Sequence, residues 1–118
     1  MKIKLIDFGL SKAMGYEDTA IEPYGSLSFK APELILENPY SFGVDLWSLG
    51  ITIYYVMFHR FPVKANDKSS KILSENYLGT MIQKGVTFAA YALKVIFQCL
   101  VKDPTKRINA DDLLSECK

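Results

Sequence analysis

A long apolar run in the middle of the chain is the feature that most limits how it can fold. Residues 41–58 are hydrophobic almost throughout, and their few polar side chains include Asp45, Ser48 and Thr52. An apolar surface on every side predicts a helix that its neighbours bury completely. The three polar residues fall at i, i+3 and i+7, so they share one helical face, and we expect that face to meet something polar. Val44 to Phe58 is shorter than the ~20 residues of a membrane span and contains an aspartate, so it is not a transmembrane helix.

The rest of the chain reads as mainly α, with one short β-strand or hairpin at the N-terminus. Residues 2–6 alternate between apolar and charged side chains, which is typical of a strand that ends in a turn. Residues 10–30 mix Gly, Ser, Thr, Pro and acidic residues without periodicity, which indicates a loop. A short helix begins at Ala31-Pro32, since proline is tolerated in the first turn, and runs to Leu36.

Three further helices are expected toward the C-terminus. The spacing of apolar residues predicts helices over 72–83 and 89–101. A last helix follows Asn109, which can cap it together with Asp112, and we expect Leu113 and Leu114 to point inward from it.

Composition excludes several classes of protein. The chain is 49% hydrophobic and 23% charged, which is ordinary globular composition, and its net charge of +1 gives no reason to expect nucleic acid or an acidic membrane surface as a partner. Cys99 and Cys117 have no disulfide or metal-site spacing, and Cys99 reads as a small buried hydrophobe. The charged first residues do not form a signal peptide, so we expect an intracellular, cytoplasmic protein.

Four motifs occur in a fixed order along the chain. They are Asp7-Phe8-Gly9, then Ala31-Pro32-Glu33, then residues 45–50 with the sequence Asp-Leu-Trp-Ser-Leu-Gly, and finally the stretch 100–107 that ends in Arg107. In this order and at these spacings, the chain resembles the eukaryotic protein kinases across nearly its whole length. The resemblance implies the large C-terminal lobe of the kinase fold, with an activation segment over residues 7–33 and a helical subdomain over residues 34–118.

The resemblance also implies roles for the first motif. Asp7 would hold a magnesium ion that bridges the phosphates of ATP, because a hard cation prefers carboxylate oxygen. Phe8 would pack against the small lobe, and Gly9 would let the backbone change between active and inactive arrangements.

Structural roles follow for the later motifs. Glu33, in Ala31-Pro32-Glu33, and Arg107 would form an ion pair, and the family's helix aspartate corresponds to Asp45. That aspartate normally accepts hydrogen bonds from the catalytic loop, which this sequence does not contain, so we expect Asp45 to face water or a different partner. Trp47 is expected as a core anchor, and Gly50 closes the motif.

Residues before Ala31 bear on the substrate and on regulation. Gly25, Ser26 and Phe29 resemble the substrate-facing activation segment of serine/threonine kinases rather than tyrosine kinases. The residues of this loop where phosphorylation could act are Thr19, Tyr24 and Ser26.

The 118 residues lack three other parts of a kinase: the glycine-rich loop, the ATP-binding lysine and the H-R-D catalytic loop. Two functions are therefore open. The chain is either part of an ATP-dependent serine/threonine kinase that binds a protein substrate, or a non-catalytic, pseudokinase-like module that binds kinase partners. In both cases we expect the isolated chain to be inactive, with doubtful binding of ATP and Mg²⁺, and to expose apolar surface on its central helix.

Overall fold

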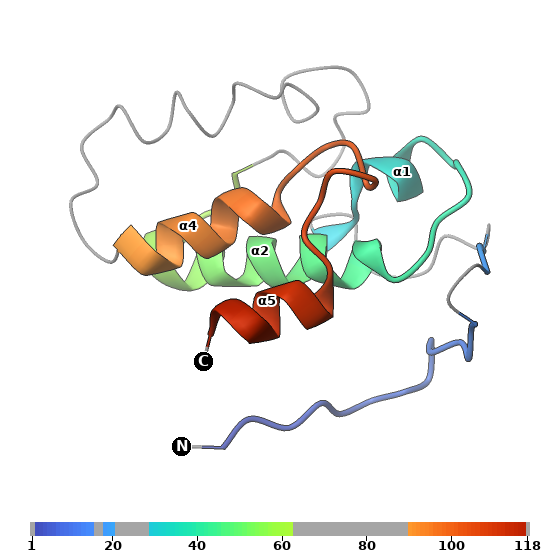
Figure 1. Ribbon diagram of the computed structural model, residues 1–118, viewed down its shortest axis with the longest axis horizontal. Helices are drawn as coiled ribbons and strands as arrows, with labels where there is room; N and C mark the ends of the chain where they lie inside the picture. The colour runs from blue at the N-terminus through green and yellow to red at the C-terminus, as the bar shows by residue number, and fades with distance from the viewer. Residues whose placement is uncertain (1, 16–17, 21–28, 63–89, 118) are drawn as a thin grey trace.

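The regular secondary structure in the described part of the chain is helical apart from one β-bridge (Figure 1). A computed structural model describes residues 2–15, 18–20, 29–62 and 90–117. In these ranges the helices are α1 (Pro32–Ile35), α2 (Gly43–Phe58), α4 (Ala90–Cys99) and α5 (Ala110–Glu116). The expected mainly α fold is confirmed for these residues. The helix expected over residues 72–83 lies outside the described ranges.

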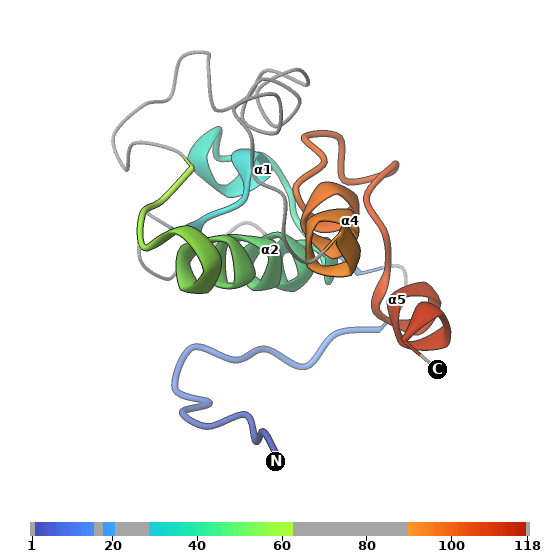
Figure 2. The ribbon, with the colours of Figure 1, turned by 90° about the vertical axis from the view of Figure 1, so that its left-hand side faces the viewer.

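The core lies where α2 and α4 pack side by side, as both ribbon views show (Figures 1 and 2). Trp47 and Ile51 of α2 are buried there against Ile96 of α4, and Ala31 and Leu100 belong to the same cluster. The expectation that Trp47 anchors the core is confirmed, because this side chain is almost completely buried. Helices this short gain most of their stability from such packing rather than from intrinsic propensity.

Close approach of the two helices depends on a glycine. A Cβ atom placed on Gly50 would lie 2.7 Å from the Cβ of Cys99 and 2.9 Å from a methyl carbon of Leu100. Cys99 is fully buried, as expected, and burial raises the pKa of its thiol to about 11, with the charge of Arg107 opposing the shift. The thiol therefore packs as a small apolar group at physiological pH.

Helix α5 has the expected cap but only half of the expected buried face. The side chain of Asn109 accepts a hydrogen bond from the backbone N–H of Asp112 at 2.8 Å, so the capping prediction is confirmed. Leu113 is buried in a second cluster with Leu46, Val95 and Cys99. Leu114 is 57% exposed, so the prediction that it points inward is wrong. Neighbouring helix positions lie about 100° apart, and a helix that packs by one narrow face cannot bury both.

Helix α2 is not buried on every side, which corrects the first expectation from the sequence. Val56 is 68% exposed, and Leu49 and Tyr55 are also exposed. The separate expectation of exposed apolar surface on the central helix is thereby confirmed. Among the described residues, no helix has the length and the apolar character needed to cross a bilayer.

The N-terminal segment does not form the expected strand. Residues 2–8 have no regular secondary structure, and Ile3, Leu5 and Ile6 are each 84% exposed. An extended segment becomes a strand only when a neighbour satisfies its backbone groups, and no described segment pairs with this one. The β-pairing in the described ranges is one antiparallel bridge, in which Ala20 and Tyr40 exchange two backbone hydrogen bonds of 2.7 Å.

Replacing Gly50 by alanine should weaken the α2–α4 contact. The added methyl would overlap Cys99 and Leu100, and overpacking of this kind costs roughly 1–3 kcal/mol. We expect Gly50→Ala to lower the free energy of unfolding by that amount in urea denaturation followed by Trp47 fluorescence. Thr52→Ala, at an exposed position of the same helix, is the control and should change it by less than about 0.5 kcal/mol. Equal stability of both variants would show that the helices can separate without cost.

Candidate functional site

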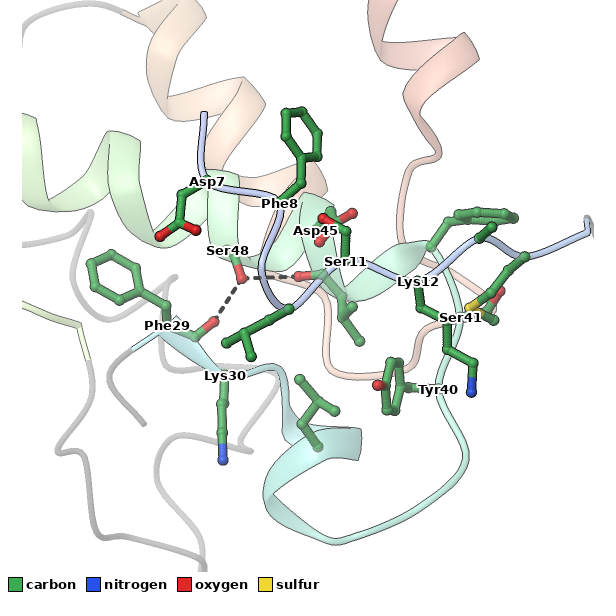
Figure 3. A pocket seen from close by; sticks show the side chains of 16 residues that line it. Asp7, Phe8, Ser11, Lys12, Phe29, Lys30, Tyr40, Ser41, Asp45 and Ser48 are labelled. Carbon is green, nitrogen blue, oxygen red and sulfur yellow. Dashed lines mark hydrogen bonds between the residues drawn. The ribbon is translucent and has the colours of Figure 1, made fainter. Parts of the chain in front are cut away.

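Three segments that lie far apart in the sequence line one open cavity of about 690 Å³ (Figure 3). Asp7 and Phe8 contribute from the N-terminal segment, Phe29 from the stretch before α1, and Asp45 and Ser48 from the first turns of α2. The structure therefore brings the Asp-Phe-Gly motif and the polar face of α2 to the same hollow. That arrangement makes this cavity the candidate site.

Asp7 has an unusual backbone conformation. Its φ is 62°, in the left-handed region that side chains other than glycine rarely adopt. The carboxylate accepts a hydrogen bond from the backbone N–H of Gly9 at 3.3 Å, which ties the tripeptide together. Glu37 and His59 share this conformation, and aspartate tolerates it better than most residues, so the backbone alone does not distinguish Asp7. Phe8, in contrast, is largely exposed to solvent.

The described residues do not bring together the ligands of a metal site. Mg²⁺ in phosphoryl-transfer enzymes takes one or two carboxylates together with phosphate oxygens and water. Within the described ranges, no group of three or more acidic, histidine or cysteine side chains could hold a metal ion. Asp7 fits the role of one carboxylate ligand, but these residues alone do not form a complete binding site for Mg²⁺ and ATP.

Asp45 faces the cavity without a hydrogen-bond donor to its side chain among the described residues. Partial burial raises the pKa of this carboxyl group above its usual value. The side chain nevertheless remains exposed, so water solvates the carboxylate and it can accept hydrogen bonds from a group that enters the cavity. This agrees with the expectation that Asp45 faces water or a different partner.

The other two polar residues of α2 meet backbone carbonyls. The hydroxyl of Ser48 lies 2.9 Å from the carbonyl oxygen of Phe29, which belongs to another segment. The hydroxyl of Thr52 donates to the carbonyl of Ser48 within the same helix. The expected polar contact is therefore present at Ser48 and absent at Thr52 within the described residues.

The guanidinium of Arg107 is the strongest polar junction near the site. It makes two bonds to Glu33, of 2.7 and 3.0 Å, so the predicted ion pair is present and bidentate. The side chains of Arg107 and Glu33 are 0% and 5% exposed. Arg107 also donates to the backbone carbonyls of Gly43 at 2.8 Å, Val101 at 2.9 Å and Lys102 at 3.4 Å.

All five N–H groups of the guanidinium can be accounted for by these contacts. The ring of Trp47 adds a cation–π contact, with its centroid 5.3 Å from the guanidinium carbon. Arg107 thus connects α1, the first residue of α2 and the loop after α4. The sequence indicated Glu33 as the partner but not the three carbonyls, because a backbone acceptor has no side-chain signature.

The loop that presents Arg107 is held by Asp103. Its backbone carbonyl accepts from the N–H of Arg107 at 3.1 Å, and its carboxylate accepts from the hydroxyl and the N–H of Thr105 at 2.7 and 2.9 Å. The hydrogen bond from the Thr105 hydroxyl is the main reason that the pKa of Asp103 lies below its usual value.

The predicted residues of the activation segment are only partly described. Gly25, Ser26 and Tyr24 lie outside the described ranges. Thr19 is exposed and next to the Ala20–Tyr40 bridge, and Phe29 is partly buried against the core. The roles proposed for these residues in phosphorylation and substrate contact stay predictions.

Known proteins match this chain over nearly its whole length. Residues 1–117 match the family described as the protein kinase domain. A protein of Acanthamoeba polyphaga mimivirus described as a serine/threonine-protein kinase is 33% identical over 113 residues, which cover 94% of this chain and 25% of that protein. A calcium and calcium/calmodulin-dependent serine/threonine-protein kinase of Lotus japonicus is 32% identical over 117 residues, or 96% and 22% of the two chains. The serine/threonine-protein kinase Nek6 of Oryza sativa subsp. japonica is 31% identical over 112 residues, or 95% and 21%. The chain spans about a quarter or less of these relatives.

Removing the charge of Glu33 should destabilise the fold strongly. Glu33→Gln keeps the shape of the side chain but leaves the buried Arg107 without a counter-charge, at a cost of roughly 3–5 kcal/mol. We expect this loss in the free energy of unfolding by urea. Lys94→Met is the matched control, because Lys94 and Glu116 form an exposed ion pair of 3.6 Å whose loss should cost less than about 1 kcal/mol. Similar losses in the two variants would contradict the assignment of Arg107 as the main junction.

Removing the Thr105 hydroxyl should raise the pKa of Asp103. Thr105→Val deletes the hydrogen bond that most favours the charged carboxylate, so a titration followed by the carboxyl carbon in NMR should move toward higher pH. Because the folded-state pKa is lowered, the stabilising contribution of Asp103 is present above its usual pKa and is lost as the pH falls through the lowered value. The variant should lose part of this pH dependence, and an unchanged titration would rule out the Thr105 contact as its cause.

Proposed function

Because this chain belongs to the protein kinase family and its mainly helical fold is a portion of the large lobe of that fold, we propose that it forms part of an ATP-dependent protein serine/threonine kinase. The observation that carries this proposal is the cavity, where Asp7 of the Asp-Phe-Gly motif and Asp45 of the α2 motif line the same hollow. The buried pair of Glu33 and Arg107 supports it, since it fastens the end of the activation segment to the helical subdomain.

In the proposed enzyme, Asp7 is a magnesium ligand, and Mg²⁺ would supply charge neutralisation for the transferred phosphoryl group. Gly25, Ser26 and Phe29 belong to the surface that meets a protein substrate. Phosphorylation at Thr19, Tyr24 or Ser26 would add negative charge to the activation segment. We assign the protein to the cell interior on the same family argument.

The isolated chain is proposed to be inactive. Phosphoryl transfer depends on positioning and electrostatic stabilisation by several groups at once. These 118 residues contain the Asp-Phe-Gly aspartate but no glycine-rich loop, no ATP-binding lysine motif and no H-R-D sequence. One carboxylate cannot replace the phosphate clamps, the second metal ligand and the catalytic base together.

The activity test compares the purified 118-residue chain with two variants. We expect no phosphate transfer from labelled ATP to a general protein substrate in the presence of Mg²⁺, either for the chain or for Asp7→Ala. Asp18→Asn is the control for loss of an acidic side chain elsewhere in the same loop. Activity that survives repurification, persists in Asp18→Asn and disappears in Asp7→Ala would show that the chain is an enzyme by itself.

A non-catalytic module that binds kinase partners is the second candidate. The observation that favours it is the exposed apolar surface of α2, where Leu49, Tyr55 and Val56 are open to solvent. The mass of the endogenous protein separates the two candidates. A polypeptide much larger than 13.3 kDa supports the complete kinase, whereas a product of that mass supports the short module.

A further inference from the structure

The hydroxyl of Ser48 lies between two possible acceptors (Figure 3). One is the carbonyl oxygen of Phe29, at 2.9 Å, and the other is that of Val44, one helical turn earlier, at 3.1 Å. A serine hydroxyl carries one hydrogen, so it can make a full bond to only one of the two at a time. The choice of acceptor decides whether Ser48 binds another segment or only its own helix.

The two carbonyls depend on Ser48 to different degrees. Val44 lies inside α2, where the helical backbone supplies donors to carbonyl groups. Phe29 lies outside the four α-helices, and Ser48 is the donor that the described residues provide for its carbonyl oxygen. A partly buried carbonyl without a donor is unfavourable, so the bond to Phe29 is the one that stabilises the fold.

The side chain of Phe29 is held in place as well. Its ring meets the ring of Phe61 edge to face, with the ring centroids 5.3 Å apart. The ring of Phe61 in turn packs on that of Tyr55, with a centroid separation of 4.7 Å. The carbonyl of Phe29 is thus fixed by the middle of α2 and its ring by the residues that follow α2. Two independent contacts therefore hold Phe29, which lies at the start of the stretch that leads into α1.

We propose that Ser48 is a positioning residue that fixes residues 29–31 on α2 through the carbonyl of Phe29. Rotation of the hydroxyl toward Val44 breaks the bond to Phe29 and loosens this stretch, and rotation back restores the bond. The consequence for catalysis rests on the proposed function, in which Phe29 belongs to the surface that meets the protein substrate. The positioning itself can be tested without any activity.

Amide hydrogen exchange in the full chain provides the test. The backbone N–H groups of Leu34 and Ile35 both donate to the carbonyl of Ala31, at 3.0 and 3.2 Å, so their exchange reports on the stretch that Ser48 holds. Ser48→Ala should accelerate exchange at these two amides roughly fivefold, the factor expected from losing one hydrogen bond, while exchange in the α2–α4 core stays unchanged. Ser48→Thr keeps a hydroxyl and should restore slow exchange.

Thr52→Ala is the matched control. Thr52 also carries a hydroxyl on α2, but its acceptor is the carbonyl of Ser48 in the same helix. Its loss should leave exchange at Leu34 and Ile35 unchanged. If Ser48→Ala does not fold, Ser48→Cys keeps the volume with a much weaker donor and should give the same selective acceleration.

Three results would overturn the proposal. They are unchanged exchange at Leu34 and Ile35 in Ser48→Ala, equal acceleration throughout α2 and α4, and failure of Ser48→Thr to restore slow exchange. None of these measurements involves phosphate transfer. A negative result would therefore remove the role of Ser48 and leave the proposed kinase function standing, and loss of the kinase proposal would leave the exchange result valid.

Discussion

The guanidinium of Arg107 is the interaction on which the described fold depends most. A buried charge is costly, and it is tolerated here because the carboxylate of Glu33 and three backbone carbonyls surround it. Those partners belong to α1, α2 and the loop after α4, which also meet in the apolar core around Trp47. The N–H donors of this one planar group set the distances between these elements. Lysine could not replace arginine here, because an ammonium group has neither the reach nor the planar, forked arrangement of donors.

The cavity shows the opposite balance between polar groups and partners. Asp45 has an exposed carboxylate that accepts no hydrogen bond from the described residues, and the carboxylate of Asp7 accepts one, from the backbone N–H of Gly9. Unlike the donors of Arg107, which all have partners in the fold, these two carboxylates can accept further hydrogen bonds from groups that enter the cavity. The exposed apolar side chains of α2 lead to the same conclusion, since a helix of this composition normally packs on more than one side. Both features are in keeping with a portion of a larger kinase domain.

Sequence reasoning found the described helices for clear physical reasons. The 3.6-residue period, the proline of α1 and the cap at Asn109 are local signals, and they located α1, α2, α4 and α5 to within a few residues. The pair of Glu33 and Arg107 came from the family resemblance. Three predictions failed because they depend on neighbours. A strand over residues 2–6 needs a partner strand, and the burial of Leu114 and of every face of α2 needs a surface to cover them. The contact from Ser48 to Phe29 has no sequence signature, because its acceptor is backbone.

The distance along the chain between Glu33 and Arg107 has a consequence for how the protein folds. The two residues are 74 positions apart, and the contact of Gly50 with Leu100 joins residues that are separated by almost half of the chain. Helices form within about a microsecond, but contacts of this range require a large loop to close first, and the entropy of closure slows the step. A mainly helical chain would ordinarily be a fast folder. Here the pair of Glu33 and Arg107 closes a loop of 74 positions, so we expect folding to be slow for a helical protein.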